Sequence, residues 1–352
     1  MADRLHILLR ELLALPGLPG DSPAVRRYLE GIWGPLADQM EVSPLGSLHA
    51  RVLGSRPAPR PCVMVSAHLD SIALAVSEIE EGFLRLIPVG RFDPRVLLGQ
   101  RLVVHGRRAI PGIVLQRVQG KTGTKTDSQP LQIEDLCVDC GLPDARLRKL
   151  VSRGDPVTFA QLPLILGNGR LVGHSLDNRG SLAALTLCLE NLHANRPEWD
   201  VVFAATAHEE ITFSGGQTSA ELIHPDAAVI VDVTYGRTPD LPEHLTFPLG
   251  DGPTNGWGAH VHPAMHDSLR KVAEQAGIPL AEEWMPEDSG TEAADIQLTH
   301  RGVPTAVLSL PILHMHSPVE IVDPEDIRKT ASLLAKFLLG MTEPLYHRGR
   351  RV

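Results

Sequence analysis

Six acidic and histidine residues lie at or near the ends of expected strands and helices along the chain. Their side chains are of the types that bind divalent metals in proteins. Four short apolar segments, residues 61–67, 201–206, 227–231 and 305–310, have the composition of strands buried on both faces. The candidate residues near their ends, with one at the start of an expected helix, are His68, Asp177, Glu209, Glu210, Asp232 and His316. Ligands collect beyond the carboxyl ends of strands in open α/β sheets, so we expect these side chains to meet at one edge.

This set of side chains suits two divalent ions that share a bridging carboxylate and leave positions open for water and substrate. Asp177, just before an expected helix, is the candidate bridge. His68 and Asp232 would complete one metal site, and Glu210 and His316 would complete the other. The expected chemistry is hydrolysis by a water that the two metals bridge.

The adjacent Glu209 and Glu210 should point in different directions, so we expect one ligand and one general base. Glu209 is the candidate base, taking a proton from the water and returning it to the leaving amine. Asp70 lies two residues after His68, so in extended backbone its carboxylate should point the same way and lie near the imidazole.

Each motif alone also has a purely structural interpretation. Asp177 could cap the helix that follows it, and His314 could compete with His316 as a ligand. The sequence from His208 to Thr212 begins like the zinc motif H-E-x-x-H but lacks its second histidine. The joint pattern at the ends of several predicted elements is what favours a metal site.

The elements that must position these residues alternate between strand and helix, which predicts an α/β fold with a sheet covered on both faces. Residues 179–194 and the segment after Asp323 have helical periodicity, with Asp323 as N-cap and Pro324 in the first turn. Residues 72–157 instead show short apolar pieces between turns, which indicates a small β-rich insertion. We therefore expect a catalytic domain in two parts, residues 1–71 and 158–352, interrupted by residues 72–157.

Composition excludes several classes of function. The formal net charge is −9 and no basic stripe is present, so nucleic acid is not an expected partner. No apolar run is long enough to cross a bilayer, and the N-terminus indicates an amphipathic helix instead of a signal peptide, so no membrane partner is expected. The four cysteines form no disulfide framework, and we expect a cytoplasmic protein.

Taken together, the motifs resemble those of peptidase family forty-two, the glutamyl-aminopeptidase-like metallopeptidases that include the tetrahedral (TET) aminopeptidases. The resemblance covers most of the chain and keeps the family order. The matching segments are Ala67-His-Leu-Asp70, Gly82-Phe-Leu-Arg85, Leu176-Asp-Asn-Arg179, Glu209-Glu210, Val231-Asp-Val-Thr234, Gly290-Thr-Glu-Ala293, Gly302-Val-Pro304 and Met315-His-Ser-Pro-Val-Glu320.

The resemblance implies a mixed sheet sandwiched by helices in a zinc-peptidase-like catalytic domain, with an inserted PDZ-like β domain used in dimerisation. It also implies two zinc or cobalt ions per chain and large homo-oligomers, often dodecamers built from dimers. By the same match Glu209 is the general base and the five ligands are those already proposed. Asp70, expected near the imidazole of His68, is counted with Glu209 among the catalytic residues. The chain departs from the family pattern at Ser71, Glu292 and His314, all near the expected substrate side of the site.

The function expected on these grounds is a metal-dependent aminopeptidase that removes N-terminal residues from short peptides. A carboxypeptidase or deacylase with two metals is an alternative. Paired carboxylates also occur in glycosidases, but that chemistry has no use for histidine ligands at strand ends. A non-catalytic assembly protein of the same fold is a further alternative, which the complete ligand set disfavours.

Overall fold

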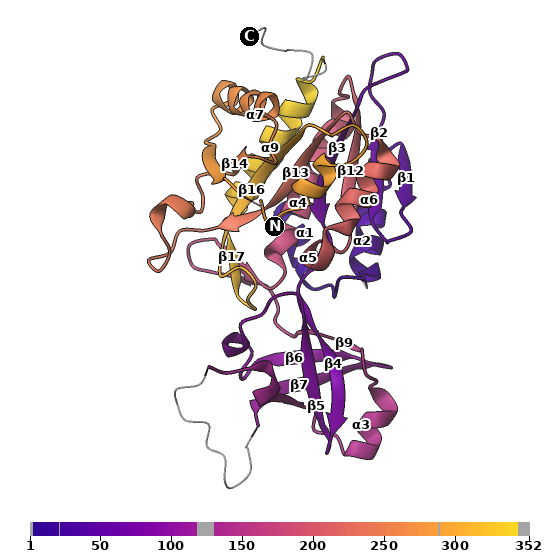
Figure 1. Ribbon diagram of the computed structural model, residues 1–352, viewed down its shortest axis with the longest axis vertical. Coiled ribbons are helices and arrows are strands. Elements are labelled where there is room, and N and C mark those ends of the chain that lie inside the picture. The colour runs from indigo at the N-terminus through magenta and orange to yellow at the C-terminus, as the bar shows by residue number, and fades with distance from the viewer. Residues whose placement is uncertain (1–2, 21, 118–129, 288, 344–352) are drawn as a thin grey trace. The chain divides into compact units, whose positions relative to one another are not determined.

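The computed structural model describes residues 3–20, 22–117, 130–287 and 289–343 of the chain (Figure 1). Contacts divide it into two compact units. The larger comprises Met1–Ser71, Pro163–Met315 and Glu320–Val352, and the smaller comprises Ile72–Leu162 with His316–Val319. Each unit has its own hydrophobic core.

A mixed sheet of 11 strands forms the centre of the larger unit. Its middle consists of four parallel strands in the order β12, β3, β13 and β16, and every residue of β3 and β12 is buried. These four strands span Asp200–Thr206, Cys62–His68, Ala227–Tyr235 and Thr305–Leu313. The flanking strands are β1 (Gln39–Val42), β2 (Leu48–Val52), β10 (Leu164–Ile165), β11 (Leu171–Gly173), β14 (Thr254–Gly258), β15 (Ala281–Met285) and β17 (Glu320–Val322).

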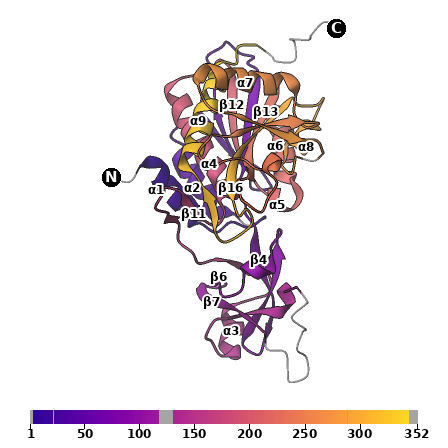
Figure 2. The same cartoon turned by 90° about the vertical axis from the view of Figure 1, so that its left-hand side faces the viewer.

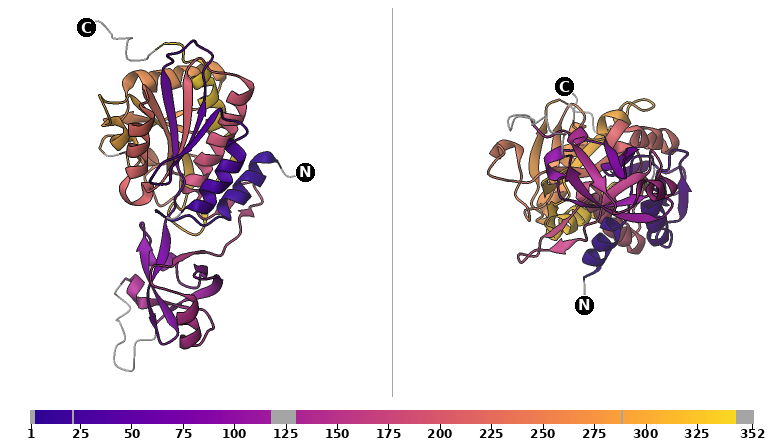
Figure 3. Two further views of the ribbon diagram at one scale, coloured as in Figure 1. Left: turned by 90° about the vertical axis from the view of Figure 1, so that its right-hand side faces the viewer. Right: turned by 90° about the horizontal axis from the view of Figure 1, so that it is seen from below.

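Helices cover both faces of this sheet (Figure 2). One face carries α1 (Arg4–Leu13), α2 (Pro23–Trp33), α4 (Leu176–Ala194), α7 (Pro263–Ala276) and α9 (Pro324–Leu339). The other face carries α6 (Ser214–Ile223) and α8 (Ala293–Gln297), and the short helix α5 (Glu209–Thr212) follows β12. Figure 3 shows the two N-terminal helices, in indigo, packed against the sheet.

Alternation along β3 assigns its side chains to these two faces. Val63 and Val65 belong to the core under α4, whereas Cys62 and Met64 belong to the core under α6 and α8. Successive side chains of a strand point to opposite faces, so His68 continues the row on the α6 and α8 side. The strand therefore delivers its terminal histidine to a defined face of the sheet.

A closed six-stranded barrel forms the smaller unit. Its strands, in barrel order, are β4 (Ala73–Glu80), β5 (Phe83–Val89), β8 (Leu136–Asp139), β7 (Ala109–Gln116), β6 (Arg101–His105) and β9 (Pro156–Phe159), and α3 spans Asp144–Leu150. The apolar interior includes Leu84, Leu102 and Val138, each fully buried. This unit is thus β-rich with an independent core.

The α/β fold predicted from strand and helix patterns is confirmed, and the sheet is mixed, as the resemblance implied. Helix α9 begins where expected, with the Asp323 carboxylate accepting a hydrogen bond from the backbone N–H of Glu325 at 3.1 Å. Helix α4 begins three residues earlier than periodicity indicated, so Asp177 lies inside its first turn in a non-helical conformation. Residues 120–130, a polar segment whose composition predicts a loop, lie outside the described residues except for Pro130. No helix among the described residues has the length and apolar character needed to span a membrane.

Replacing Leu189 of α4 by alanine should lower the free energy of unfolding by about 2–5 kcal/mol, because its side chain is fully buried in the core under the sheet and a cavity would remain. Urea unfolding followed by circular dichroism measures the loss. Leu222 of α6 is 49% exposed, so Leu222→Ala is the matched control and should change stability by less than about 0.5 kcal/mol. Equal losses in the two variants would contradict this assignment of the core.

Candidate metal centre

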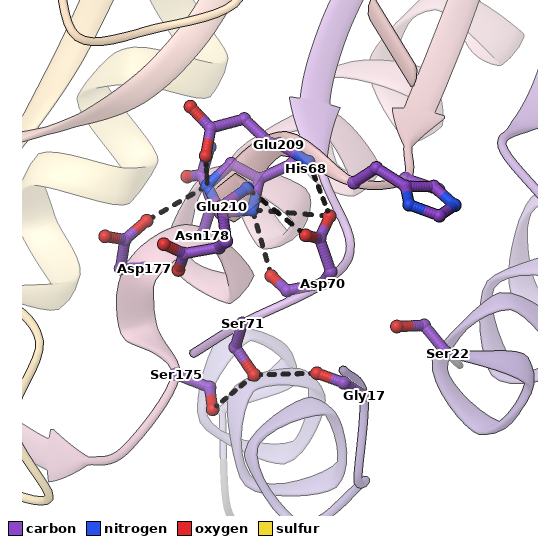
Figure 4. Close-up of polar contacts among 12 residues, drawn as sticks. Gly17, Ser22, His68, Asp70, Ser71, Ser175, Asp177, Asn178, Glu209 and Glu210 are labelled. Atoms are coloured by element: carbon purple, nitrogen blue, oxygen red, sulfur yellow. Dashed lines mark hydrogen bonds and ion pairs between the residues drawn. The ribbon is translucent and has the colours of Figure 1, made fainter. Parts of the chain in front are cut away.

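Five of the six candidate residues meet near the carboxyl ends of the parallel strands. Figure 4 shows four of them, His68, Asp177, Glu209 and Glu210. His68 is the last residue of β3 and pairs in register with Thr206, the last residue of β12. The chain then turns into α5, which carries Glu209 and Glu210. Asp232 lies in β13 and Asp177 in the first turn of α4. Four separate elements therefore converge on one point.

The imidazole of His68 lies at the centre of this group. Its Nε2 atom is 3.0 Å from Asp177 Oδ1, 3.7 Å from Glu209 Oε2 and 3.8 Å from Asp232 Oδ1. All four of these side chains are at most 6% exposed. Such proximity between buried carboxylates and one imidazole is the arrangement that holds a cation.

Two sets of three potential ligand atoms lie within 4.8 Å of one another, and both contain His68. One set adds Glu209 and Asp232, and the other adds Asp177 and Glu210. The expected pairing of His68 with Asp232 is thus present, as is the proximity of Asp177 to Glu210. Glu209 also lies within ligand distance, which the sequence did not indicate.

His316 stays outside these two sets. It belongs to the smaller unit by its contacts, so its role as a ligand remains a prediction. His314, the possible competitor, is exposed. Both histidines adopt left-handed backbone conformations, with φ values of 60° and 56°.

Asp70 differs from its expected arrangement. The imidazole Nδ1 of His68 bonds to the backbone carbonyl of Asp70 at 2.9 Å, while the Asp70 carboxylate lies 3.9 Å from that nitrogen. The carboxylate instead accepts hydrogen bonds from the backbone N–H groups of Glu209 and Glu210, at 3.2 and 3.3 Å. A carboxylate at the first N–H groups of a helix satisfies donors that have no partner within it. Asp70 therefore fixes the main chain of both glutamates, and the carbonyl fixes the imidazole.

Two further residues position the acidic ligands, and neither role was predicted from the sequence. The Asn178 amide donates hydrogen bonds to Asp232 Oδ1 and to the Val231 carbonyl, both at 3.0 Å. The Glu320 carboxylate accepts a hydrogen bond from the backbone N–H of Asp177 at 3.2 Å. Both residues belong to segments that match the family motifs, Leu176–Arg179 and Met315–Glu320, and only this match could have indicated their roles from the sequence.

Arg179 connects the start of α4, which carries Asp177, to the end of α1. Its guanidinium is fully buried and donates to the carbonyl of Leu12 at 2.9 Å. Burial lowers the pKa of Arg179 to about 10, and the Asp70 carboxylate acts in the opposite direction. Ser71, a departure from the family pattern, donates its hydroxyl to the Gly17 carbonyl at 2.9 Å (Figure 4). The loop after β3 is thus attached to the segment that follows α1.

The charges around His68 favour the binding of a positive ion among these side chains. Burial raises the pKa values of Glu209 and Glu210 well above the usual range, and the carboxylates around them add to the shift. Burial likewise raises the pKa of Asp232 to about 8. Although burial opposes it, the carboxylates of Glu209 and Asp177 raise the pKa of His68 well above its ordinary value. Several carboxylates that repel one another, with an imidazole among them, fit the donor chemistry of divalent metal ions.

A family model described as M42 glutamyl aminopeptidase matches residues 46–333 of this chain. The chain belongs to the M42 glutamyl aminopeptidase family. It is therefore a peptidase, and as a member of a metallopeptidase family it depends on a divalent metal. The resemblance seen in the motifs is confirmed.

The chain is also similar to individual aminopeptidases and solved structures. A lysyl aminopeptidase of Pyrococcus furiosus is 31% identical over 349 residues, covering 96% of this chain and 97% of the relative. The crystal structure of a TET aminopeptidase from a marine sediment archaeon, Thaumarchaeota archaeon, superimposes with a TM-score of 0.91 at 25% identity, covering 98% of this chain and 99% of that one. The TET1 peptidase of Pyrococcus horikoshii shares the fold with a TM-score of 0.84 at 24% identity, covering 96% and 100% of the two chains.

Replacing Asp70 by asparagine should lower kcat/KM by about 10- to 100-fold with metal content retained, because the amide nitrogen cannot accept the second N–H bond that fixes the two glutamates. Steady-state kinetics with elemental analysis measures both quantities. Asp326 also accepts two backbone N–H bonds, from Gly250 and Gly252, so Asp326→Asn is the matched control with activity unchanged. Full activity in Asp70→Asn would contradict the positioning role.

Proposed function

We propose that this chain is an aminopeptidase that removes N-terminal residues from short peptides with two divalent metal ions, zinc or cobalt. The observation that carries the proposal is the cluster around His68, in which two sets of three ligand atoms share one imidazole. Because one imidazole nitrogen binds a single ion, a second ion in this cluster would take carboxylates, with one carboxylate bridging the pair as in other two-metal hydrolases. The M42 family assignment supports the same reaction.

The proposed ligands are His68, Asp177, Glu210, Asp232 and His316. Asp177 is proposed as the bridging carboxylate, supported by its 3.0 Å approach to His68 and its grouping with Glu210. His316 enters from its place in the sequence, shortly after β16, and from the family motif. When bound, the two ions would supply Lewis acidity to the reacting carbonyl and to water.

Glu209 is proposed as the general base. Its Oε2 atom lies 3.7 Å from His68 Nε2, at the edge of the cluster, and its backbone N–H is held by Asp70. A carboxylate in this position can accept a proton from the attacking water and return it to the amine that leaves. Glu209 is 6% exposed, so the proton transfer would take place away from bulk solvent.

Assembly into a homo-oligomer is the third part of the proposal. The TET1 peptidase of Pyrococcus horikoshii can assemble into a tetrahedron or a large octahedral shell. The barrel of this chain exposes apolar side chains on β5 and β7, including Ile87, Ile113 and Leu115, each 37–49% exposed. We propose that the barrel is a PDZ-like domain that forms dimers, and that dimers build a dodecamer. A cytoplasmic location remains a prediction.

Glu209→Gln should lower kcat by about 10²–10⁴-fold while the protein keeps its metal, because the amide cannot accept the proton of the attacking water. Aminoacyl chromogenic substrates and elemental analysis measure activity and metal. As controls, a chelator should abolish wild-type turnover and added zinc or cobalt should restore it. Free amino acids should appear from peptide N-termini and not from N-acetylated peptides. An active Glu209→Gln enzyme, or release from the C-terminus, would contradict the proposal.

The native mass of the purified protein should be a multiple of its 38.2 kDa chain that matches a dimer or a dodecamer. Light scattering coupled to gel filtration measures it. Replacing Ile87 and Ile113 by aspartate should reduce the mass, because charges would then lie in the proposed apolar contact. A monomeric wild type at micromolar concentration would contradict the assembly proposal.

A further inference from the structure

Glu292 is a buried acidic residue outside the proposed ligand set. It precedes α8 as the N-cap residue, and its side chain is 1% exposed. Its carboxylate faces the hydroxyls of Ser66 and Thr206, yet neither carboxylate oxygen nor either hydroxyl completes a hydrogen bond of ordinary geometry. Burying a charged carboxylate without hydrogen bonds raises the free energy of the folded state, so the presence of Glu292 at this position needs an explanation.

The location of Ser66 and Thr206 connects Glu292 to the metal centre. Ser66 lies two residues before His68 in β3, so both side chains point to the face covered by α6 and α8. Thr206 is the register partner of His68 on β12. The carboxylate of Glu292 therefore lies beneath the end of the strand that carries the central ligand.

Gly216 of α6 provides the space for this carboxylate. A Cβ atom on Gly216 would lie 2.4 Å from Glu292 Oε2 and 2.8 Å from Glu292 Cβ, well inside van der Waals contact. Any larger residue at position 216 would displace the glutamate. The first turn of α6 is thus shaped around the acidic side chain.

The electrostatic neighbours of Glu292 belong to the candidate metal centre. Burial raises the pKa of Glu292 to about 7, and the Ser66 and Thr206 hydroxyls and His68 counter this shift while Asp70 adds to it. His68 and Asp232, with Glu209, form one of the two sets of ligand atoms.

We propose that Glu292 is a positioning residue that stabilises the cation held by His68 and Asp232 through its buried negative charge, without binding that cation. The inference rests on the proposed two-metal function. A negative charge in surroundings of low dielectric attracts a nearby divalent ion far more strongly than it would in water. The unfavourable burial of the carboxylate is then offset once the ion is bound.

Glu283 offers a matched comparison in the same unit. It is a half-buried carboxylate, and its two oxygens accept hydrogen bonds from the hydroxyls of Thr234 and Thr254, both at 2.5 Å. Its charge is therefore satisfied locally, and it has no need of a distant cation. Removing the charge at Glu283 and at Glu292 should have different consequences.

The test measures binding of cobalt to the metal-free full-length protein by calorimetry and by the visible absorption of the bound ion. Glu292→Gln should weaken at least one of the two binding steps by about 10- to 100-fold and alter the absorption spectrum. The midpoint of thermal unfolding of the metal-free variant should not fall. Glu283→Gln should leave cobalt affinity unchanged.

If Glu292 has a purely structural role, Glu292→Gln should lower the unfolding midpoint of the metal-free protein and leave cobalt affinity unchanged. That result would overturn the proposal.

If Glu292→Gln lowers both the unfolding midpoint and the cobalt affinity, the variant Glu292→Asp, which keeps the charge, separates the two roles. Recovery of cobalt affinity in Glu292→Asp supports the proposal, and no recovery contradicts it. Gly216→Ala should also weaken binding, because a Cβ atom there would displace the Glu292 side chain. A wild-type protein that binds no cobalt would refute the two-metal function itself.

Discussion

The buried carboxylates around His68 are the constraint on which the catalytic unit depends. A carboxylate oxygen of each of Asp177, Glu209 and Asp232 lies within 4 Å of Nε2 of this imidazole, and all three side chains are buried. Like charges so arranged repel one another, and only cations or protons can relieve the repulsion. A protein would not keep this arrangement for stability, because replacing such groups by apolar ones is often neutral or stabilising. The cluster therefore indicates a function that requires the charges.

The surrounding structure holds these groups against their repulsion. Parallel pairing fixes the ends of β3 and β12 side by side, and Asp70 joins the loop after β3 to the start of α5. Helix α6 approaches closely because Gly215 has no side chain, since a Cβ there would lie 1.8 Å from the carbonyl oxygen of Ala207. Strand pairing, the hydrogen bonds of the Asp70 carboxylate to two backbone N–H groups, and the close approach of α6 thus help to determine where the ligands point.

Apolar runs predicted the four central strands, and the rule that ligands gather at strand ends predicted that His68 would lie near Asp232 and near Glu210. These are local patterns, so the sequence alone reveals them. The partners of Asp70 were not predictable, since they depend on where the turn after β12 places two backbone N–H groups. Glu292 becomes part of the site only because α8 packs on the same face as Ser66. Closure of the β-rich unit into a barrel likewise depends on pairing between distant strands.

Two metal ions at the cluster around His68 are the centre of the proposed function, so their number and place are what must be measured. A crystal structure of the protein grown with zinc, with anomalous differences recorded on both sides of the zinc absorption edge, tests this most directly. We expect two zinc peaks in each chain, one beside His68 and Asp232 and one beside Asp177 and Glu210. No peak at this cluster, or zinc bound only elsewhere on the chain, would contradict the two-metal site.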